Sequence, residues 1–204
     1  MARSSKKRDA IVAAAIAEFK ANGYQATSMD QISLTAAVSK RTVYNHFASK
    51  ELLFDAIVMQ MLALVSTSVS LSYAVDKPLD VQLTTIGQQE VALLGNQAFV
   101  DLAKVCVAEA MHSPQRINEA LTRVEGREGD LTSWLTAATT DGRLAIDDVQ
   151  FAATQFFGLI KSFCFWPQMV QGQPFPDETR QQAIVQSAVA MFLALYTLTD
   201  AHGQ

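Results

Sequence analysis

Helix-breaking residues are rare in this chain and fall at widely spaced points. Its 204 residues include five prolines and nine glycines, while half of the residues are apolar and alanine, leucine, glutamine and valine are abundant. Such a composition favours long helices over strands and over disorder. We therefore predict an all-α protein. The expected breaks between its helices are Asn22-Gly23, Asp76-Lys77-Pro78, Gly95-Asn96, Ser113-Pro114, Asp141-Gly142-Arg143 and QGQPFP.

Charged residues are divided unevenly along the chain. Residues 1–50 carry eight Lys or Arg against three acidic residues, whereas residues 51–204 carry eight against seventeen. The net charge of −4 thus combines a basic segment of +5 with an acidic segment of −9. Such asymmetry suggests two jobs in one chain, with a polyanion as the partner of the basic part. We expect an N-terminal domain over residues 1–50, joined through a long helix to a larger helical domain over residues 51–204.

Short helices with their own start signals are predicted inside the basic segment. The first should run from about Ser5 to Ala21 and end at Asn22-Gly23, where glycine suits the left-handed position past a helix end. Serines should cap the next three helices: Ser28, which forms a capping-box pattern with Gln31, Ser39 before a helix over Lys40–Phe47, and Ser49 before a helix from Lys50 into the acidic region.

The helix predicted over Lys40–Phe47 has a very narrow apolar face. At 100° per residue, Val43 and Phe47 share one face, while Arg41 and Asn45 lie on the opposite face. Eight residues span about 12 Å, which is close to the width of the DNA major groove. A short helix that is anchored by two residues, faces its donors outward and follows a tight turn at 37–39 fits the reading helix of a helix-turn-helix.

Polar residue types around this helix suit duplex DNA. Arg41 can reach guanine O6 and N7, and Asn45 can pair with adenine or hold a phosphate. Thr42 and Tyr44 can offer hydroxyls to phosphates or carbon surface to thymine methyl groups. Further phosphate contacts are expected at helix starts and in the N-terminal tail: Thr27, Ser28, Lys50, Lys6, Lys7 and Arg8. A polar face on a short helix is often only a solvated surface. Here, however, a basic segment, short capped helices and a two-residue apolar anchor occur together within fifty residues, and this coincidence favours DNA binding.

Several of these residues also form a family pattern: Phe19 before Asn22-Gly23-Tyr24, the sequence Tyr44-x-His46-Phe47, and Lys50-Glu51-Leu52-Leu53. With them, residues 8–58 resemble the DNA-binding domain of the tetracycline-repressor (TetR) family. The resemblance implies DNA contacts at Thr27, Ser39, Lys40, Arg41, Thr42, Tyr44, His46 and Lys50. It also implies that Tyr44 and His46 bind phosphate or sugar, and His46 could at the same time cap the end of its helix.

Two acidic-domain segments, LAKVCVAEAMHSPQRINEAL and FAATQFFGLIKSFCFWP, resemble the AefR-like C-terminal domain of a subset of these regulators. The resemblance implies a domain that binds a small apolar or aromatic effector. Candidate pocket residues are Phe99, Cys106, Glu109, Met111, Trp134, Phe156, Phe163 and Trp166. Aromatic and Met residues at helical spacing more often belong to an ordinary core, and the pocket interpretation stays open beside that one.

Dimerisation is expected to involve the last helices. A helix starting at Asp147 should reach Trp166-Pro167, and a final helix should run from about Asp177 to Thr199. The final helix is apolar on more than one side over residues 183–196, so it must be buried, either in a core or in a four-helix interface across a two-fold axis. The resemblance favours a homodimer on a palindromic operator. We expect a ligand-responsive regulator, a repressor by default, with activation left open.

No sequence pattern indicates an enzyme, a metal site or a cofactor. A nucleophile elbow, a glycine-rich phosphate loop, a zinc signature and a dense acid–base cluster are all missing. Cys106 and Cys164 should be buried, reduced thiols. The longest apolar stretches are interrupted by polar residues and look too short to span a membrane, so we expect a cytoplasmic protein. The rival interpretation is an architectural helical protein, which would bind DNA with little sequence preference.

Overall fold

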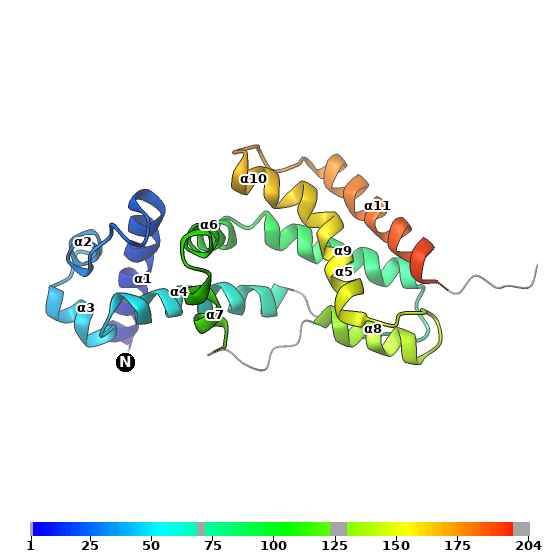
Figure 1. The fold of residues 1–204 in the computed structure, drawn as a ribbon, viewed down its shortest axis with the longest axis horizontal. Coiled ribbons are helices and arrows are strands. Elements are labelled where there is room, and N and C mark those ends of the chain that lie inside the picture. Colours follow the sequence, from blue (N-terminus) through cyan, green and yellow to red (C-terminus); the bar gives the residue numbers. More distant parts are fainter. Residues whose placement is uncertain (1, 69–71, 123–129, 198–204) are drawn as a thin grey trace, which may run out of the picture. The chain divides into compact units, whose positions relative to one another are not determined.

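The computed structural model describes residues 2–68, 72–122 and 130–197, and these residues form eleven helices and no strand (Figure 1). The predicted all-α class is therefore confirmed. In chain order the helices are α1 (Ala2–Asn22), α2 (Met29–Thr35), α3 (Lys40–His46), α4 (Lys50–Ser68), α5 (Leu79–Leu94), α6 (Gln97–His112), α7 (Pro114–Thr122), α8 (Asp130–Thr140), α9 (Val149–Cys164), α10 (Trp166–Val170) and α11 (Glu178–Tyr196).

The chain packs as two compact units. Unit 1 comprises Met1–Leu64 and Gln97–Gly126, and unit 2 comprises Val65–Asn96 and Arg127–Gln204. Unit 1 therefore combines α1–α3 and most of α4 with α6 and α7, which come from the acidic part of the sequence. The boundary expected after residue 50 concerns the division of function, and it stays a prediction.

Local signals in unit 1 act largely as the sequence indicates. Gly23, with a φ of 78°, ends α1, and its N–H donates to the Phe19 carbonyl over 2.9 Å. The capping box of α2 is complete: the Gln31 N–H donates to Ser28 Oγ over 3.2 Å, and the Ser28 N–H donates to Gln31 Oε1 over 2.9 Å. α1 begins at Ala2, earlier than predicted, and the Ser5 hydroxyl donates to the Asp9 side chain one turn further along the helix.

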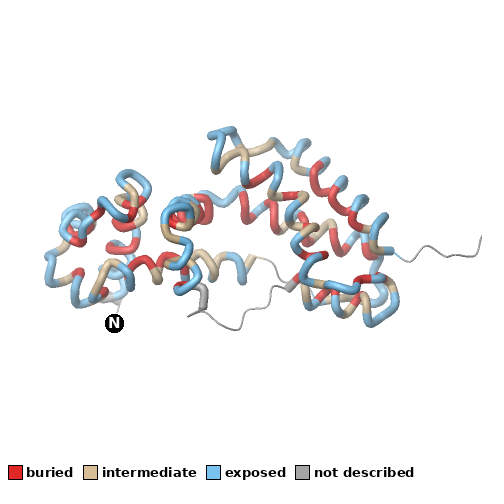
Figure 2. The backbone as a smooth tube through the Cα atoms, in the orientation of Figure 1, coloured by how far each residue is buried: buried red, intermediate tan, exposed pale blue. Residues whose placement is uncertain are grey.

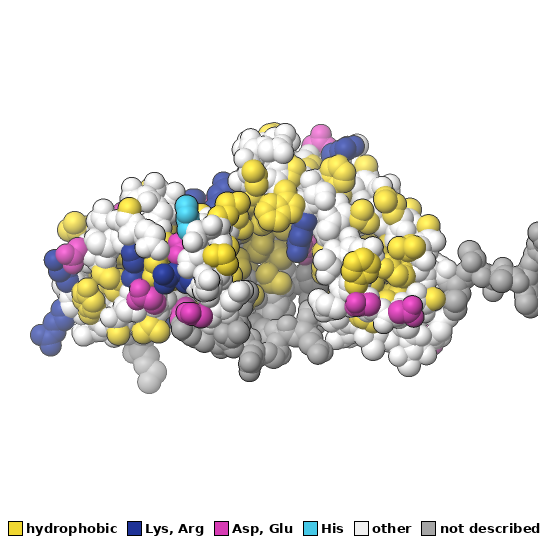
Figure 3. Space-filling model, in the orientation of Figure 1, with side chains coloured by type: hydrophobic (Ala, Val, Ile, Leu, Met, Phe, Trp, Pro, Cys, Tyr) yellow, Lys and Arg dark blue, Asp and Glu magenta, His cyan; other side chains and the backbone are white. Residues whose placement is uncertain are grey.

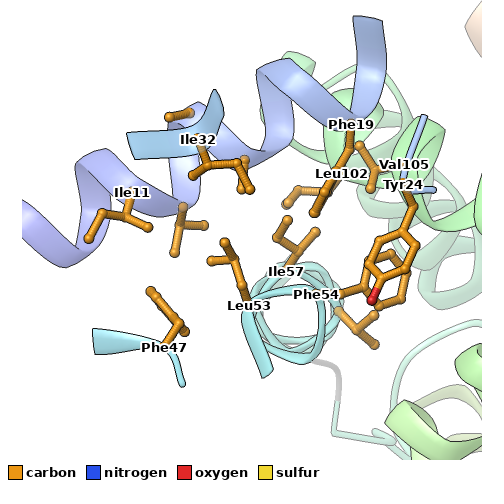
Figure 4. Close-up of a cluster of buried hydrophobic side chains, with 14 of the residues drawn as sticks. Ile11, Phe19, Tyr24, Ile32, Phe47, Leu53, Phe54, Ile57, Leu102 and Val105 are labelled. Atoms are coloured by element: carbon orange, nitrogen blue, oxygen red, sulfur yellow. The ribbon is translucent and has the colours of Figure 1, made fainter. Parts of the chain in front are cut away.

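A single hydrophobic cluster holds unit 1 together (Figure 4). The rings of Phe19, Tyr24 and Phe54 meet with centroids 5.2–6.4 Å apart, and Leu102 and Val105 of α6 belong to the same cluster. Figure 2 shows the buried positions along these helices. α6 is thus part of the core beneath the N-terminal helices, a contact that no local sequence signal announces.

Unit 2 is built on α5, α9 and α11, which pack against one another. Phe156 of α9 meets Phe192 of α11 edge to face, with ring centroids 5.4 Å apart. The helix predicted from Asp147 instead has Asp148 as its N-cap, because the Asp148 carboxylate accepts the Phe151 N–H over 2.9 Å.

Two predicted helix ends in unit 2 were placed too far along the chain. α9 stops at Cys164, and the short helix α10 follows from Trp166. α11 is capped by Asp177 and ends at Tyr196, where Thr197 turns to extended backbone. The predicted end at Thr199 lies outside the described residues.

Candidate nucleic-acid interface

A tight turn joins α2 to α3. Its central residue, Ala37, has a φ of 52°, in the left-handed region that a side chain disfavours. The Val38 N–H donates to the Ser33 carbonyl over 3.1 Å and closes the turn. Ser39 then caps α3 by accepting the Thr42 N–H over 3.2 Å. The turn predicted at residues 37–39 and its serine cap are both confirmed.

α3 presents most of its circumference to solvent. Val43 is fully buried and Phe47, at its C-terminal end, is 5% exposed. Arg41 and Asn45 are exposed on the other side, and Tyr44 is 51% exposed. The helix is therefore anchored on the two predicted residues, with its donors directed outward.

Other predicted contact residues are already engaged by the protein. Thr27 is buried, and its hydroxyl donates to the Gly23 carbonyl over 2.8 Å. Lys40 pairs with Asp30. Thr42 shares a 2.8 Å hydroxyl contact with Ser39. Ser28 is exposed but committed to the capping box, and His46 is half-buried. Their contact with DNA stays a prediction.

Lys50 is the most heavily committed of these residues. Its Nζ donates to the carbonyls of Tyr24 over 2.7 Å, Thr27 over 2.8 Å and Gln25 over 3.3 Å. An ammonium group has three N–H donors, so this set uses them all. Burial lowers the Lys50 pKa. Lys50 thus fixes the loop before α2, a role that the sequence analysis missed.

Basic residues of α1 add to the exposed charge of unit 1. Lys6 and Lys7 are exposed, and the Arg8 guanidinium lies 5.0 Å from the centre of the Phe47 ring. All three lie in the first turns of α1, within the helix predicted from about Ser5, and their contact with phosphate stays a prediction. Several Lys and Arg side chains are visible on unit 1 in Figure 3, interspersed with acidic ones.

Tyr24 is buried, and its hydroxyl and ring are the centre of a polar cluster that the sequence analysis did not foresee. Two cations lie near its ring, with Lys50 Nζ 4.4 Å and Arg116 Cζ 4.3 Å from the ring centre. Arg116 Nε donates to Glu109 Oε1 over 2.8 Å. Burial raises the pKa of the Tyr24 hydroxyl well above its usual range. Arg116 lies 92 residues from Tyr24, which explains why no local pattern reveals the contact.

The eight candidate effector residues are divided between the two units. In unit 1, Phe99, Cys106 and Glu109 are buried, whereas Met111 is 71% exposed. Glu109 is the partner of Arg116, which accounts for its burial as a charged group. These four residues carry core, ion-pair and surface roles in the unit, and a ligand contact for them stays a prediction.

In unit 2, Trp134 and Phe156 are buried, while Phe163 and Trp166 are about half exposed. The Trp134 indole N–H donates to Gln82 Oε1 over 3.1 Å, so its polar atom is satisfied within the core. Three hollows formed by described residues are lined by residues other than these eight.

Both cysteines are free and buried, as predicted. Burial raises the pKa of the Cys106 thiol to about 12 and that of Cys164 to about 11, with the Glu90 charge adding to the second shift. Both thiols are therefore poorly reactive. In the described part of the chain, no group of three or more His, Cys, Asp or Glu could hold a metal ion.

Among the described helices, α4 by itself is long and apolar enough to cross a membrane, and α5 and α6 pass the same test together across a 73° bend. The prediction that this apolar stretch is too short to span a membrane was therefore wrong, because the helix that contains it continues to Ser68. Leu53, Phe54, Ile57 and Val58 of α4 are buried in the hydrophobic cluster of unit 1.

Comparison with known proteins decides the family. Residues 11–57 match the family model described as bacterial regulatory proteins, tetR family, and residues 81–198 match the AefR-like transcriptional repressor, C-terminal domain. The chain belongs to the TetR family. As a member of it, the chain is a DNA-binding transcriptional regulator and not an enzyme, and both predicted resemblances are confirmed.

Solved structures agree with this assignment over nearly the whole TetR-family chain. A TetR-family regulator from Pseudomonas syringae pv. tomato is 40% identical, with a TM-score of 0.83 over 95% of this chain and 97% of that one. The flavonoid-responsive regulator FrrA is 25% identical, with a TM-score of 0.73 over 95% and 98%.

Curated relatives match the N-terminal region. The regulator UidR of Escherichia coli K12 is 43% identical over 53 residues, which are 26% of this chain and 27% of UidR. The chain thus spans about a quarter of the length of the curated relatives it matches.

Proposed function

We propose that the protein is a homodimeric, cytoplasmic, ligand-responsive repressor that reads a palindromic operator with α3 and is released by a small apolar effector. The observation that carries this proposal is the geometry of α3. Val43 and Phe47 anchor the helix, which leaves Arg41, Tyr44 and Asn45 exposed on a surface about as long as the major groove is wide. Arg41 reads guanine, while Tyr44 and His46 hold the backbone.

Apolar side chains exposed on unit 2 support a homodimer. Phe151 on α9 is 57% exposed, and Met191 and Leu195 on α11 are 57% and 64% exposed. Hydrophobic groups gather on the visible face of unit 2 (Figure 3). A two-fold contact through α9 and α11 would cover them and set the spacing of two α3 helices, which matches a palindromic site.

Release by an effector follows from population shift. DNA binding selects dimers with one spacing of the reading helices, and an effector that prefers another spacing moves the population away from DNA. Nearly complete release needs a differential affinity of about 5 kcal/mol. The flavonoid response named for FrrA supports an apolar or aromatic effector class. α4 follows α3 in the chain and continues into the first residues of unit 2. It is therefore the helix that we propose transmits the effector's influence to α3.

The test is binding to the DNA directly upstream of the protein's own coding region. Wild type should prefer one palindrome in this DNA over scrambled duplexes. Arg41→Ala should lose about 1–3 kcal/mol and relax the preference at one base position, because it removes a base-edge contact. Tyr44→Phe should weaken binding to all duplexes alike, because a contact to the DNA backbone carries no sequence information. Equal affinity of wild type for every duplex would instead support an architectural protein.

A further inference from the structure

A helix from outside the TetR-type segment completes the DNA-reading unit. The matched TetR model ends at residue 57, yet α6 and α7 lie in unit 1 with α1–α3. α6 packs on α1, and Lys20 of α1 forms an ion pair with Asp101 of α6. α7 follows α6 and carries Arg116 to Tyr24, in the loop between α1 and α2.

The contacts of Arg116 form a connected set, which we call the Tyr24 clasp: Tyr24, Lys50, Glu51, Glu109 and Arg116. Arg116 Nη1 donates to the Tyr24 hydroxyl over 3.1 Å, and that hydroxyl donates to Glu51 Oε1 over 3.2 Å. Arg116 Nε donates to Glu109, whose side chain is 2% exposed. The planar guanidinium stacks on a ring and presents its N–H donors to a carboxylate in a fixed fork, a geometry that a lysine ammonium does not reproduce.

The clasp bears on the position of α2 and α3. Lys50 holds the carbonyls of residues 24, 25 and 27, and both Lys50 and Arg116 lie against the Tyr24 ring. The next residue after this loop is Ser28, the N-cap of α2. α2 in turn packs on α3. A change at Arg116 therefore reaches the reading helix through the loop that starts α2.

We propose that Arg116 is a positioning residue for operator reading: through the Tyr24 clasp, α7 holds the α1–α2 loop so that α3 is presented correctly to DNA. This inference rests on the proposed function of α3. Arg116 lies in the region matched by the AefR-like model, so this region would help to position the DNA-reading helix.

The experiment compares Arg116→Gln with Arg143→Gln as a matched control. Arg143 also lies beside a tyrosine ring, that of Tyr73, and donates to two backbone carbonyls, but it belongs to unit 2. Arg116→Gln should weaken operator binding about 10-fold at a temperature where it is fully folded. Arg143→Gln should leave the affinity within about two-fold, because the contacts it loses, to Tyr73 and to the carbonyls of Val75 and Lys77, are all within unit 2. Arg116→Lys should not restore binding.

Two readouts separate positioning from other roles. A residue that touches phosphate changes the slope of log affinity against log salt by about one, so Arg116→Gln should leave that slope unchanged. Hydrogen exchange of the amides of residues 24–27 should be faster in Arg116→Gln than in wild type. If the lone buried carboxylate of Glu109 unfolds Arg116→Gln, the double variant with Glu109→Gln removes that charge and should show the same loss of affinity.

The outcomes are distinct. Wild-type affinity in folded Arg116→Gln, or a loss shared by Arg143→Gln, would overturn the positioning role, and so would a slope reduced by about one. If wild type binds no duplex preferentially, the proposed function fails instead. Exchange at residues 24–27 then decides about the clasp alone, and unchanged exchange would refute it.

Discussion

Ala37 holds a backbone conformation that residues with a side chain seldom adopt. Its φ is 52°, at the turn that sets α3 against α2, while Gly23, with a φ of 78°, occupies the similar position after α1. Left-handed backbone costs a residue with a Cβ about 1 kcal/mol, whereas glycine adopts it freely. The chain therefore uses glycine at one left-handed turn and tolerates alanine at the other.

Exchanging these two residue types should move stability in opposite directions. Ala37→Gly should stabilise the protein by up to about 1 kcal/mol, and Gly23→Ala should destabilise it by at least as much. No atom lies within 4 Å of a Cβ built on Gly23, so the second effect would come from backbone strain alone. Urea unfolding of both variants measures the changes, and a loss of stability in Ala37→Gly would contradict the strain argument.

Single residues also show where sequence reasoning stops. The exposed donors Arg41 and Asn45 and the anchor at Val43 follow from helical periodicity, because that depends only on neighbours along the chain. The commitments of Thr27 and Lys50 to backbone carbonyls do not follow, because their partners are set by how a loop folds. A residue type suited to phosphate is equally suited to a carbonyl oxygen.

Packing of α5 against its neighbours depends on a glycine. A Cβ on Gly87 would come within 2.9 Å of Val185 Cγ1 on α11 and 3.4 Å of Ile160 Cδ1 on α9, whereas one on Gly158 of α9 would meet nothing within 4 Å. Valine is stiff about its first side-chain torsion, so α11 would have to shift. Periodicity predicts these helices, but it does not predict how closely they approach.

The two glycines give a matched pair of substitutions inside helices. Gly158→Ala should stabilise by about 0.5–1 kcal/mol, because alanine is the better helix former. Gly87→Ala should destabilise by about 1–3 kcal/mol, because overpacking outweighs the same gain in helix propensity. Thermal unfolding of the two variants side by side checks this. Equal stabilisation by both would show that α5 and α11 can separate without loss.

A buried carboxylate links α5 to α9. Glu90 is 4% exposed, and its ion-pair partner Lys161 lies 3.4 Å from Oε1, where a hydrogen bond is weak. Burial raises the pKa of Glu90 although the Lys161 charge opposes the shift. In the folded protein the Glu90 carboxyl therefore keeps its proton at pH values where the same carboxyl in the unfolded chain, with a pKa of about 4.3, has lost it.

The sign of this linkage gives a pH prediction. The contribution of Glu90 to the free energy of unfolding should be most favourable below about pH 4.3. It should be lost as pH rises towards the raised pKa of the folded state, by at most about 1.4 kcal/mol per pH unit. Wild type should thus lose stability relative to Glu90→Gln as pH rises above about 4.3, measured by urea unfolding. A flat difference between wild type and Glu90→Gln would exclude the shift.

On the scale of the whole molecule, the sequence predicts the helices better than their grouping. Turn residues and caps locate most helix boundaries within a few residues, and the charge asymmetry separates a basic from an acidic part. Yet α6 and α7 join the N-terminal helices, since the core of unit 1 takes Leu102 and Val105 as well as Phe19. Contacts between segments about a hundred residues apart do not follow from helical periodicity, which depends only on neighbours along the chain. Pocket residues come from several such segments, so the sequence does not separate them from ordinary core residues.

The proposed dimer can be tested on the apolar surface of α11. Leu195 is 64% exposed, and a two-fold contact through α9 and α11 would bury it together with Met191. Leu195→Glu would then bury an unpaired carboxylate, which costs about 3–5 kcal/mol and weakens the dimer at least about 100-fold. Val81→Glu introduces the same charge at a 52% exposed site on α5 and should leave the dimer intact. Sedimentation equilibrium should show a monomer for Leu195→Glu alone, with affinity for the palindrome reduced to that for a half-site. A Leu195→Glu protein that stays dimeric would place the interface elsewhere.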